Sequence, residues 1–304
     1  MQHNGTPVKT KYFAQLIALS ALWGASFMLI RIASPLLGPN VMAALRIGLA
    51  TLTLTVIMAA MKQRWPWRHW RELTMLGALS VAVPFLLFAW AALRLPAGYS
   101  ALLNSTAVVF GTLAAAWMKE DTLTARKLTG CVLGFAGVAL IVRLGPVAPT
   151  PEVLLAALSC IGAAACYGVA TPLMKRATKR MEPLAIAAGI HLASLALLMP
   201  GAAWSWPQAR YSEEAMLALL VLGVVTSGLA YWMHLRVIRH VSSVAAISPA
   251  FMIPVFGVTW GHLFLGEALG SGIWAGGALI LLATALITGF NPVQKILDAV
   301  DARP

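Results

Sequence analysis

Long apolar stretches alternate with short polar breaks along the whole chain. Each stretch is about 20 residues long, the length of an α-helix that crosses the hydrocarbon core of a bilayer. The breaks contain proline, glycine or charged residues, which end helices. The pattern predicts an all-α membrane protein with transmembrane helices over residues 12–33, 39–61, 72–93, 97–118, 125–143, 152–174, 183–203, 214–237, 242–264 and 271–290.

The composition agrees with a membrane solvent and argues against a nucleic-acid partner. Of the 304 residues, 60% are hydrophobic and 11% are charged, whereas soluble domains average about 45–50% and 25%. The net charge of +12 is spread singly or in small groups between apolar runs. No basic surface is long enough to follow a phosphate backbone. Membrane lipid is therefore a predicted partner, and nucleic acid is not.

The basic residues predict the orientation of the chain. With ten spans, 17 of the 22 Lys and Arg residues fall on the side of the two termini. Three, Arg94, Arg143 and Arg210, fall on the other side. Short cytoplasmic loops carry an excess of Lys and Arg, so both termini are predicted to be cytoplasmic.

The two halves of the sequence resemble each other. Trp23-Gly24 recurs 144 positions later as Tyr167-Gly168, and Pro39 recurs at the same offset as Pro183. Five spans in each half is an odd number, so the second half is predicted to enter the membrane upside down relative to the first. The predicted organisation is a cytoplasmic N-terminal segment (1–11), a first five-helix repeat (12–143), a periplasmic linker (144–151), a second, inverted repeat (152–290) and a cytoplasmic tail (291–304).

Short motifs in order along the chain then suggest a family. They are Leu22-Trp23-Gly24 with Phe27, Leu45-Arg46, Leu95-Pro96-Ala97-Gly98, Glu120 followed by Gly130 to Gly137, Pro254, and Gly266-Glu267. With these motifs the chain resembles the drug/metabolite transporter superfamily, in particular its ten-helix EamA-type exporters and most of all the bacterial aromatic and neutral amino-acid exporters. The resemblance implies export of small metabolites, often amino acids, across a bacterial inner membrane. One departure is Ala107, where the family usually has a proline.

Polar residues inside the spans are candidates for substrate binding. Arg46 lies several residues inside a span, where a charge is expensive unless it faces a cavity or the bundle interior. It either meets a substrate carboxylate or pairs with helix-end carbonyls near the interface. His191 occupies the corresponding region of the second half, and Asn104 and Ser105 form a polar cluster that either binds substrate or joins helices by hydrogen bonds.

Aromatic residues and prolines inside the spans complete the candidate site. Substrate contact or, alternatively, core packing is expected for Trp23, Phe85, Trp90, Tyr167 and Trp232. Hinge or gating roles, or simple kinks, are expected for Pro84, Pro249 and Pro254, because proline interrupts the helical hydrogen bonds. GxxxG patterns such as Gly130 to Gly134 predict close helix packing.

The chemistry of the spans argues against the remaining function classes. A nucleophile with a base in reach and a cluster of metal ligands are both missing, so no catalytic residue, metal or cofactor is predicted. The Asp and Glu residues lie in loops or at span ends, which favours a facilitator over a proton-coupled carrier. His191 and His234 keep proton coupling open. A nucleotide-sugar, sugar-phosphate or drug transporter of the same superfamily fits the sequence next best, followed by an intramembrane enzyme or a channel. The oligomeric state is left open, with a monomer among the options.

Overall fold

Helices make up the regular structure of the computed structural model, which describes residues 8–95, 97–141, 150–265 and 272–288. No strand occurs within these ranges. Ten helical stretches follow one another, one at each predicted apolar stretch. Seven of them are long and apolar enough to cross a membrane, and the prediction of an all-α membrane fold is confirmed.

The first half begins with α1 (Thr10–Leu37) and α2 (Pro39–Ala60). One continuous helical stretch then consists of η1 (Trp67–His69), α3 (Trp70–Gly77), η2 (Ala78–Ala82) and α4 (Val83–Ala91). The half ends with α5 (Ala97–Asn104), α6 (Thr106–Trp117) and α7 (Ala125–Ile141). The second half begins with α8 (Pro151–Ala177) and α9 (Pro183–Ser205), which is extended by η3 (Trp206–Gln208). One continuous helical stretch then consists of α10 (Glu213–Leu220), η4 (Val221–Leu229) and α11 (Ala230–Ile238). The half ends with α12 (Ser243–Ile247), α13 (Pro249–Leu265) and α14 (Gly272–Thr288). The predicted tail, most of the predicted linker, Pro96 and Gly266-Glu267 lie outside the described residues.

The polar breaks end and start helices by local chemistry. Gly38 has a φ of 74° between α1 and α2, a conformation that glycine adopts without the steric penalty of a side chain. Pro39 then occupies the first turn of α2, where its missing N–H is no loss. Ser212 and Ser242 cap α10 and α12, each accepting a hydrogen bond from a backbone N–H three residues on.

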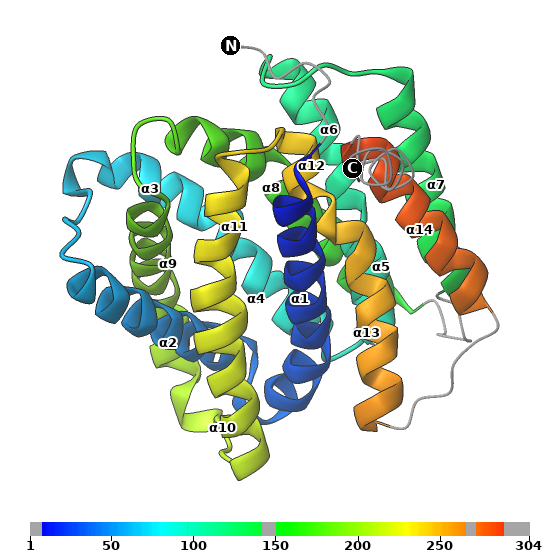
Figure 1. The fold of residues 1–304 in the computed structure, drawn as a ribbon. Helices are drawn as coiled ribbons and strands as arrows, with labels where there is room; N and C mark the ends of the chain where they lie inside the picture. The colour runs from blue at the N-terminus through cyan, green and yellow to red at the C-terminus, as the bar shows by residue number, and fades with distance from the viewer. Residues whose placement is uncertain (1–7, 96, 142–149, 266–271, 289–304) are drawn as a thin grey trace, which may run out of the picture.

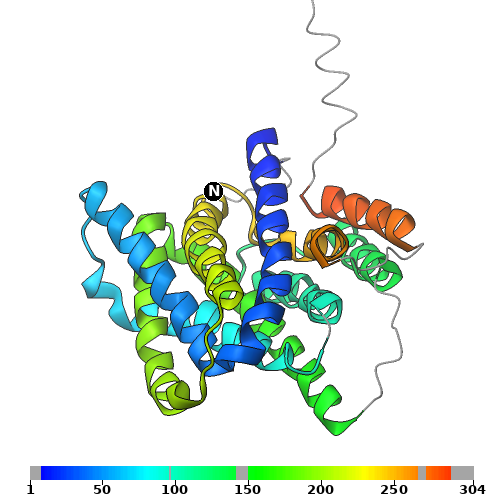
Figure 2. The same ribbon diagram turned by 90° about the horizontal axis from the view of Figure 1, so that it is seen from below.

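Helices of one half pack mainly against helices of the other half. In Figures 1 and 2, α7 and α14 lie side by side at one edge of the bundle, and α2 and α9 lie together toward the opposite edge. Between these edges α1 packs on α13 and α8 packs on α6, while α2 packs on η4 and α9 packs on α3 and η2. Each of these pairings has its counterpart in the other half, as two interlocked repeats require.

The helix ends show that the repeats are inverted. Tyr12, at the start of α1, stacks on His240, just after α11, with ring centroids 5.0 Å apart. Lys175, near the end of α8, donates to the Val241 carbonyl, which also lies just after α11. The first helix of the first half therefore starts on the face where the first helix of the second half ends. We call this the N-terminal face; it is the upper face in Figure 1.

Ion pairs gather on the N-terminal face. Glu120 accepts hydrogen bonds from Arg176 Nε at 2.7 Å and Lys179 Nζ at 3.4 Å, joining the ends of α6 and α8. Arg180 reaches Glu72 at 2.6 Å, joining α8 to α3. Burial opposes ionisation of Glu120, but the hydrogen bonds and charges of Arg176 and Lys179 outweigh it and lower the pKa of the carboxyl. These contacts tie the two halves together at this face.

The lowered pKa of Glu120 predicts a pH-dependent contribution to stability. Because the pKa is lower when folded, the contribution is complete above the ordinary carboxyl pKa of about 4.3 and is lost as pH falls through the folded-state pKa. We expect Glu120→Gln to lower the melting temperature of the detergent-solubilised protein by about 2 °C at neutral pH. The difference from wild type should be smaller at pH 3 than at neutral pH, because the carboxyl binds a proton as the pH falls through its folded-state pKa. An equal difference at both pH values would contradict the prediction.

Candidate functional site

A cavity lies at the centre of the bundle, between the two repeats. Helices of both halves contribute its wall, which is mostly apolar. Six aromatic side chains line it: Trp23, Phe27, Phe85, Phe88, Tyr167 and Tyr231. Small and aliphatic side chains of α12 and α13, among them Ala246, Ala250 and Ile253, cover another side. The few polar groups are therefore the ones that can orient a ligand.

Arg46 is the cationic group of this cavity. It is 3% exposed. Its Nε donates to Ser227 Oγ at 2.7 Å and its Nη2 donates to Thr226 Oγ1 at 3.4 Å. Its guanidinium lies 3.9 Å from the centre of the Phe85 ring. All three partners are neutral, so the structure supplies no opposite charge to it within the described residues.

Two glycines of η4 bring α2, and with it Arg46, close to these hydroxyls. A Cβ at Gly223 would lie 2.4 Å from Leu49 Cβ and 2.9 Å from the Arg46 carbonyl oxygen. A Cβ at Gly228 would lie 3.2 Å from a methyl carbon of Thr53. The absence of side chains at both positions lets the two backbones meet, which fixes Arg46 against Thr226 and Ser227.

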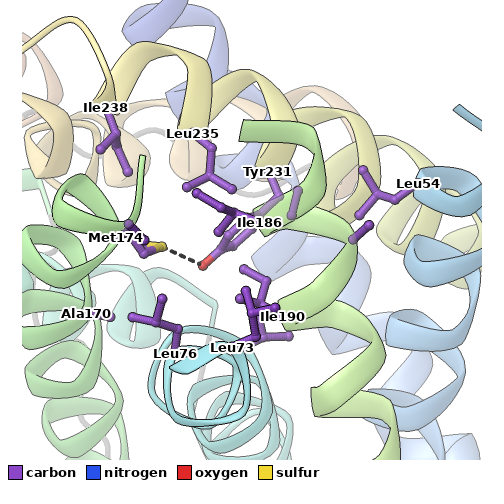
Figure 3. Packing of buried hydrophobic residues seen from close by; sticks show 14 of the residues in the cluster. Leu54, Leu73, Leu76, Ala170, Met174, Ile186, Ile190, Tyr231, Leu235 and Ile238 are labelled. Atoms are coloured by element: carbon purple, nitrogen blue, oxygen red, sulfur yellow. Dashed lines mark hydrogen bonds between the residues drawn. The ribbon is translucent and has the colours of Figure 1, made fainter. Parts of the chain in front are cut away.

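The two π-helical segments offer carbonyl groups to aromatic donors. Trp23 Nε1 donates to the Thr226 carbonyl of η4 at 3.0 Å. In the other half, the Tyr231 hydroxyl donates to the Ser80 carbonyl of η2 at 3.0 Å. Figure 3 shows Tyr231 extending from α11 into the core, with its oxygen 3.8 Å from Met174 Sδ. π-helical turns often occur at functional sites, and here each anchors one aromatic wall residue.

Two hydrogen-bond acceptors in the cavity wall have no partner among the described residues. One is Asn104 Oδ1, at the end of α5, and the other is His234 Nδ1, on α11. The other ring nitrogen of His234, Nε2, lies 3.0 Å from the Ala246 carbonyl oxygen. Buried acceptors are normally hydrogen-bonded, and each of these two atoms lacks a donor among the described residues.

The structure places five of the nine predicted binding residues in the cavity wall: Trp23, Arg46, Phe85, Asn104 and Tyr167. The other four lie elsewhere. The Arg94 guanidinium lies 4.0 Å from the centre of the Trp90 ring. The Arg236 guanidinium lies 5.7 Å from the centre of the Trp232 ring. Ser105 is buried at the break between α5 and α6. His191 packs behind Tyr231, with ring centroids 4.9 Å apart.

Sequence reasoning gave no binding role to Tyr231, Phe88, Thr171 or His234, which also line the cavity. Tyr231 and His234 stand three positions apart and so share one face of α11. This spacing is a usable signal. Trp232, one residue after Tyr231, lies on a different face.

The predicted hinge prolines lie at irregular points of the helices. Pro84 comes two residues after the π-helical η2. Pro249 starts α13 directly after the break at Ser248, and Pro254 interrupts α13 beside the cavity residue Ile253. In the first half, Ala107 lines the cavity. The hinge roles stay predictions.

No group of three His, Cys, Asp or Glu side chains among the described residues is placed to hold a metal ion.

Comparisons with known proteins extend over almost the whole chain. The EamA-like transporter family matches residues 11–143 and 154–289. The chain is 25% identical to the uncharacterized transporter YvbV of Bacillus subtilis, with 94% of each chain covered. It is 24% identical to a probable terminal-alkyne amino-acid exporter of Streptantibioticus cattleyicolor, with 90% of this chain and 91% of that one covered. It is 26% identical to the uncharacterized inner membrane transporter YedA of Escherichia coli, over 91% and 90% of the two chains.

A solved crystal structure shares the fold. It superposes with a TM-score of 0.76 at 18% sequence identity, and the match covers 92% of this chain and 96% of the other.

Proposed function

This chain belongs to the EamA-like transporter family, and we propose that it exports neutral or aromatic amino acids by alternating access, as a facilitator. The family and the relatives make it a multi-pass transporter of the bacterial inner membrane. The names of the family and of its relatives describe transporters rather than enzymes. The proposal concerns the substrate, the direction and the mechanism.

The observation that carries the proposal is the single uncompensated guanidinium in an aromatic cavity. A buried charge without an opposite charge is unfavourable unless something else compensates it. A substrate carboxylate would do so and would form a charge-assisted pair with the fork of Arg46. The aromatic walls would hold an apolar or aromatic side chain. A ligand with one carboxylate and an apolar body is what an amino acid of this class offers.

Sugar phosphates and nucleotide sugars fit the cavity less well. A phosphate ester carries close to two negative charges at neutral pH. Arg46 is the only Lys or Arg among the residues that line the cavity. The amino-acid proposal is also supported by the name of one relative, a probable amino-acid exporter.

Alternating access is supported by the matched packing of the two repeats. α1 on α13 and α8 on α6 are one equivalent pair of contacts, and the cavity lies between them. Exchange of conformation between two inverted halves would open the shared cavity first to one side and then to the other. Pro84, Pro249 and Pro254 are the proposed hinges, with both termini in the cytoplasm.

A counterflow experiment tests the proposed function. Full-length protein in liposomes preloaded with unlabelled L-phenylalanine should accumulate external labelled L-phenylalanine transiently and saturably. Liposomes without the protein are the control. The same assay should be run in parallel with other amino acids, a sugar phosphate and a nucleotide sugar as substrates. A pH gradient should not change the accumulation if the carrier is a facilitator. Saturation by a phosphorylated solute with no response to any amino acid would overturn the substrate, and flux without saturation would indicate a channel.

A further inference from the structure

We propose that His234 Nδ1 and Asn104 Oδ1 form a subsite for the amino group of a substrate whose carboxylate is held by Arg46. The inference rests on the proposed function and deepens it. It assigns the specificity for amino acids, as opposed to other carboxylates with the same side chain, to two named acceptor atoms.

The hydrogen bonding of His234 shows which ring nitrogen accepts. Nε2 lies 3.0 Å from the Ala246 carbonyl oxygen. A carbonyl oxygen only accepts, so Nε2 must carry the hydrogen. In the neutral imidazole the other nitrogen, Nδ1, then has a free lone pair and is an acceptor. Nδ1 has no partner among the described residues, and His234 is 6% exposed.

Asn104 supplies the second acceptor from the opposite repeat. It ends α5 directly before the break at Ser105, and it is 4% exposed. Its Oδ1 is buried without a hydrogen bond from the part of the chain that the structure describes. A buried acceptor left unsatisfied is unfavourable. A primary ammonium group brings three N–H donors and would satisfy both atoms, whereas a ligand without an N–H would leave them unpaired.

The surroundings of the two acceptors suit a cation. The elements packed against α11 are α1, α8, α9, η4 and α12. The Trp23 ring of α1 meets the His234 ring edge to face, with centroids 4.9 Å apart, and the Tyr231 ring centroid lies 6.2 Å from that of His234. Aromatic faces attract cations. No cavity-lining side chain is an acid, so the ammonium must be held by neutral acceptors and rings.

Charges orient the two polar groups of the ligand, which are attached to the same α-carbon. Arg46 is a cation and repels an ammonium, so the carboxylate is expected to face the guanidinium and the amino group to point away from it. The other basic groups near α11, which are Lys175, Arg236, Arg239 and His240, belong to its end at the N-terminal face and do not line the cavity. A ligand with both groups is thereby given one orientation.

Two ligands that differ only in the amino group test the subsite. L-phenylalanine and 3-phenylpropionate share the ring and the carboxylate. Binding to the full-length, detergent-purified protein at pH 7.5 would be measured by calorimetry. We expect the wild type to bind phenylalanine at least about tenfold more tightly. Equal affinity of the wild type for both ligands would overturn the subsite without any substitution.

Substitutions then locate the acceptors. His234→Gln keeps an N–H group that can reach the Ala246 carbonyl but removes Nδ1, and Asn104→Leu removes Oδ1 at nearly constant size. Each is expected to weaken phenylalanine binding about tenfold and to change the affinity for 3-phenylpropionate less than about twofold. His240→Gln, the same substitution outside the cavity, is the matched control and should change neither ligand.

The outcomes separate this inference from the proposed function. Equal weakening of both ligands, or no weakening of either, would show that the two residues only shape the cavity and would overturn the subsite. Wild-type protein that binds 3-phenylpropionate but not phenylalanine would do the same. Wild-type protein that binds neither would overturn the amino-acid function itself, and the subsite with it.

Discussion

Arg46→Ala should weaken amino-acid binding about 100-fold while the protein remains folded. The loss follows from removal of a charge-assisted, desolvated pair with the substrate carboxylate, where each hydrogen bond to a charged group contributes about 1.5–3 kcal/mol. Folding should persist because the substitution leaves behind two neutral hydroxyls, Ser227 and Thr226, and no unpaired charge. The measurement is the concentration for half-maximal counterflow, together with the elution profile of the purified protein.

Two further arginine variants make this result specific. Arg46→Lys keeps the charge but loses the planar fork that fits a carboxylate, so its effect should be intermediate. Arg31→Gln is the matched control, because Arg31 is exposed and donates to the Ala92 carbonyl at the end of α4. Wild-type affinity in Arg46→Ala, or an equal loss in Arg31→Gln, would show that Arg46 is not the carboxylate site.

The fold was predictable because lipid imposes simple requirements on the chain. Every spanning segment must be a helix of about 20 apolar residues, and polar or proline-rich breaks mark its ends. The predicted stretch 183–203 corresponds to α9 at Pro183–Ser205, and the predicted stretch 39–61 to α2 at Pro39–Ala60. The odd number of helices in each half was sufficient to predict the inversion of the repeats.

The site was predictable only in part, because the sequence does not show which face of each helix is turned toward the cavity. A helix that is apolar all round has no polar stripe to show which face meets the cavity. Tyr231 and Trp232 are adjacent and similar in the sequence, yet Tyr231 lines the cavity and Trp232 lies beside Arg236. Arg46 was easier to place, since a charge inside a span has few acceptable environments.

The close helix contacts were also predictable only in part from the sequence. The GxxxG pattern at Gly130 and Gly134 predicts close packing, and a Cβ at either position would lie within 2.7 Å of Ile287 or Phe251. Isolated glycines nevertheless make crossings between the halves that are at least as close. A Cβ at Gly77 would lie 2.6 Å from the Ile190 carbonyl oxygen, and one at Gly223 would lie 2.4 Å from Leu49. An isolated glycine carries no pattern that identifies its role.

Gly77→Ala and Gly223→Ala should each destabilise the protein strongly, although a single methyl group is added. Alanine is normally preferred over glycine inside a helix by about 1 kcal/mol. At these positions the methyl would clash with backbone or a core side chain that packs against it, and overpacking costs about 1–3 kcal/mol or more. The melting temperature of the solubilised full-length protein should fall by several degrees in both variants, about 2–4 °C for each kcal/mol of stability lost.

The matched controls use glycines with room for a methyl. At Gly48 and Gly162 the nearest atoms to an added Cβ are side-chain methyls at 3.9 Å, so Gly48→Ala and Gly162→Ala should leave the melting temperature unchanged or raise it. Melting temperatures in Gly77→Ala and Gly223→Ala equal to those of the controls would show that the crossings give way easily.

The two destabilised variants should differ in substrate binding. Gly223 meets the carbonyl of Arg46 itself, at 2.9 Å from the added Cβ, whereas Gly77 meets Ile190 and Ser194, neither of which lines the cavity. Displacing α2 at Arg46 moves the guanidinium relative to Ser227, so Gly223→Ala should also weaken phenylalanine binding in the protein that remains folded. Gly77→Ala should bind as the wild type does below its melting temperature. Equal affinities for the two variants would mean that the position of Arg46 is set by its own hydrogen bonds and not by the approach of α2 to η4.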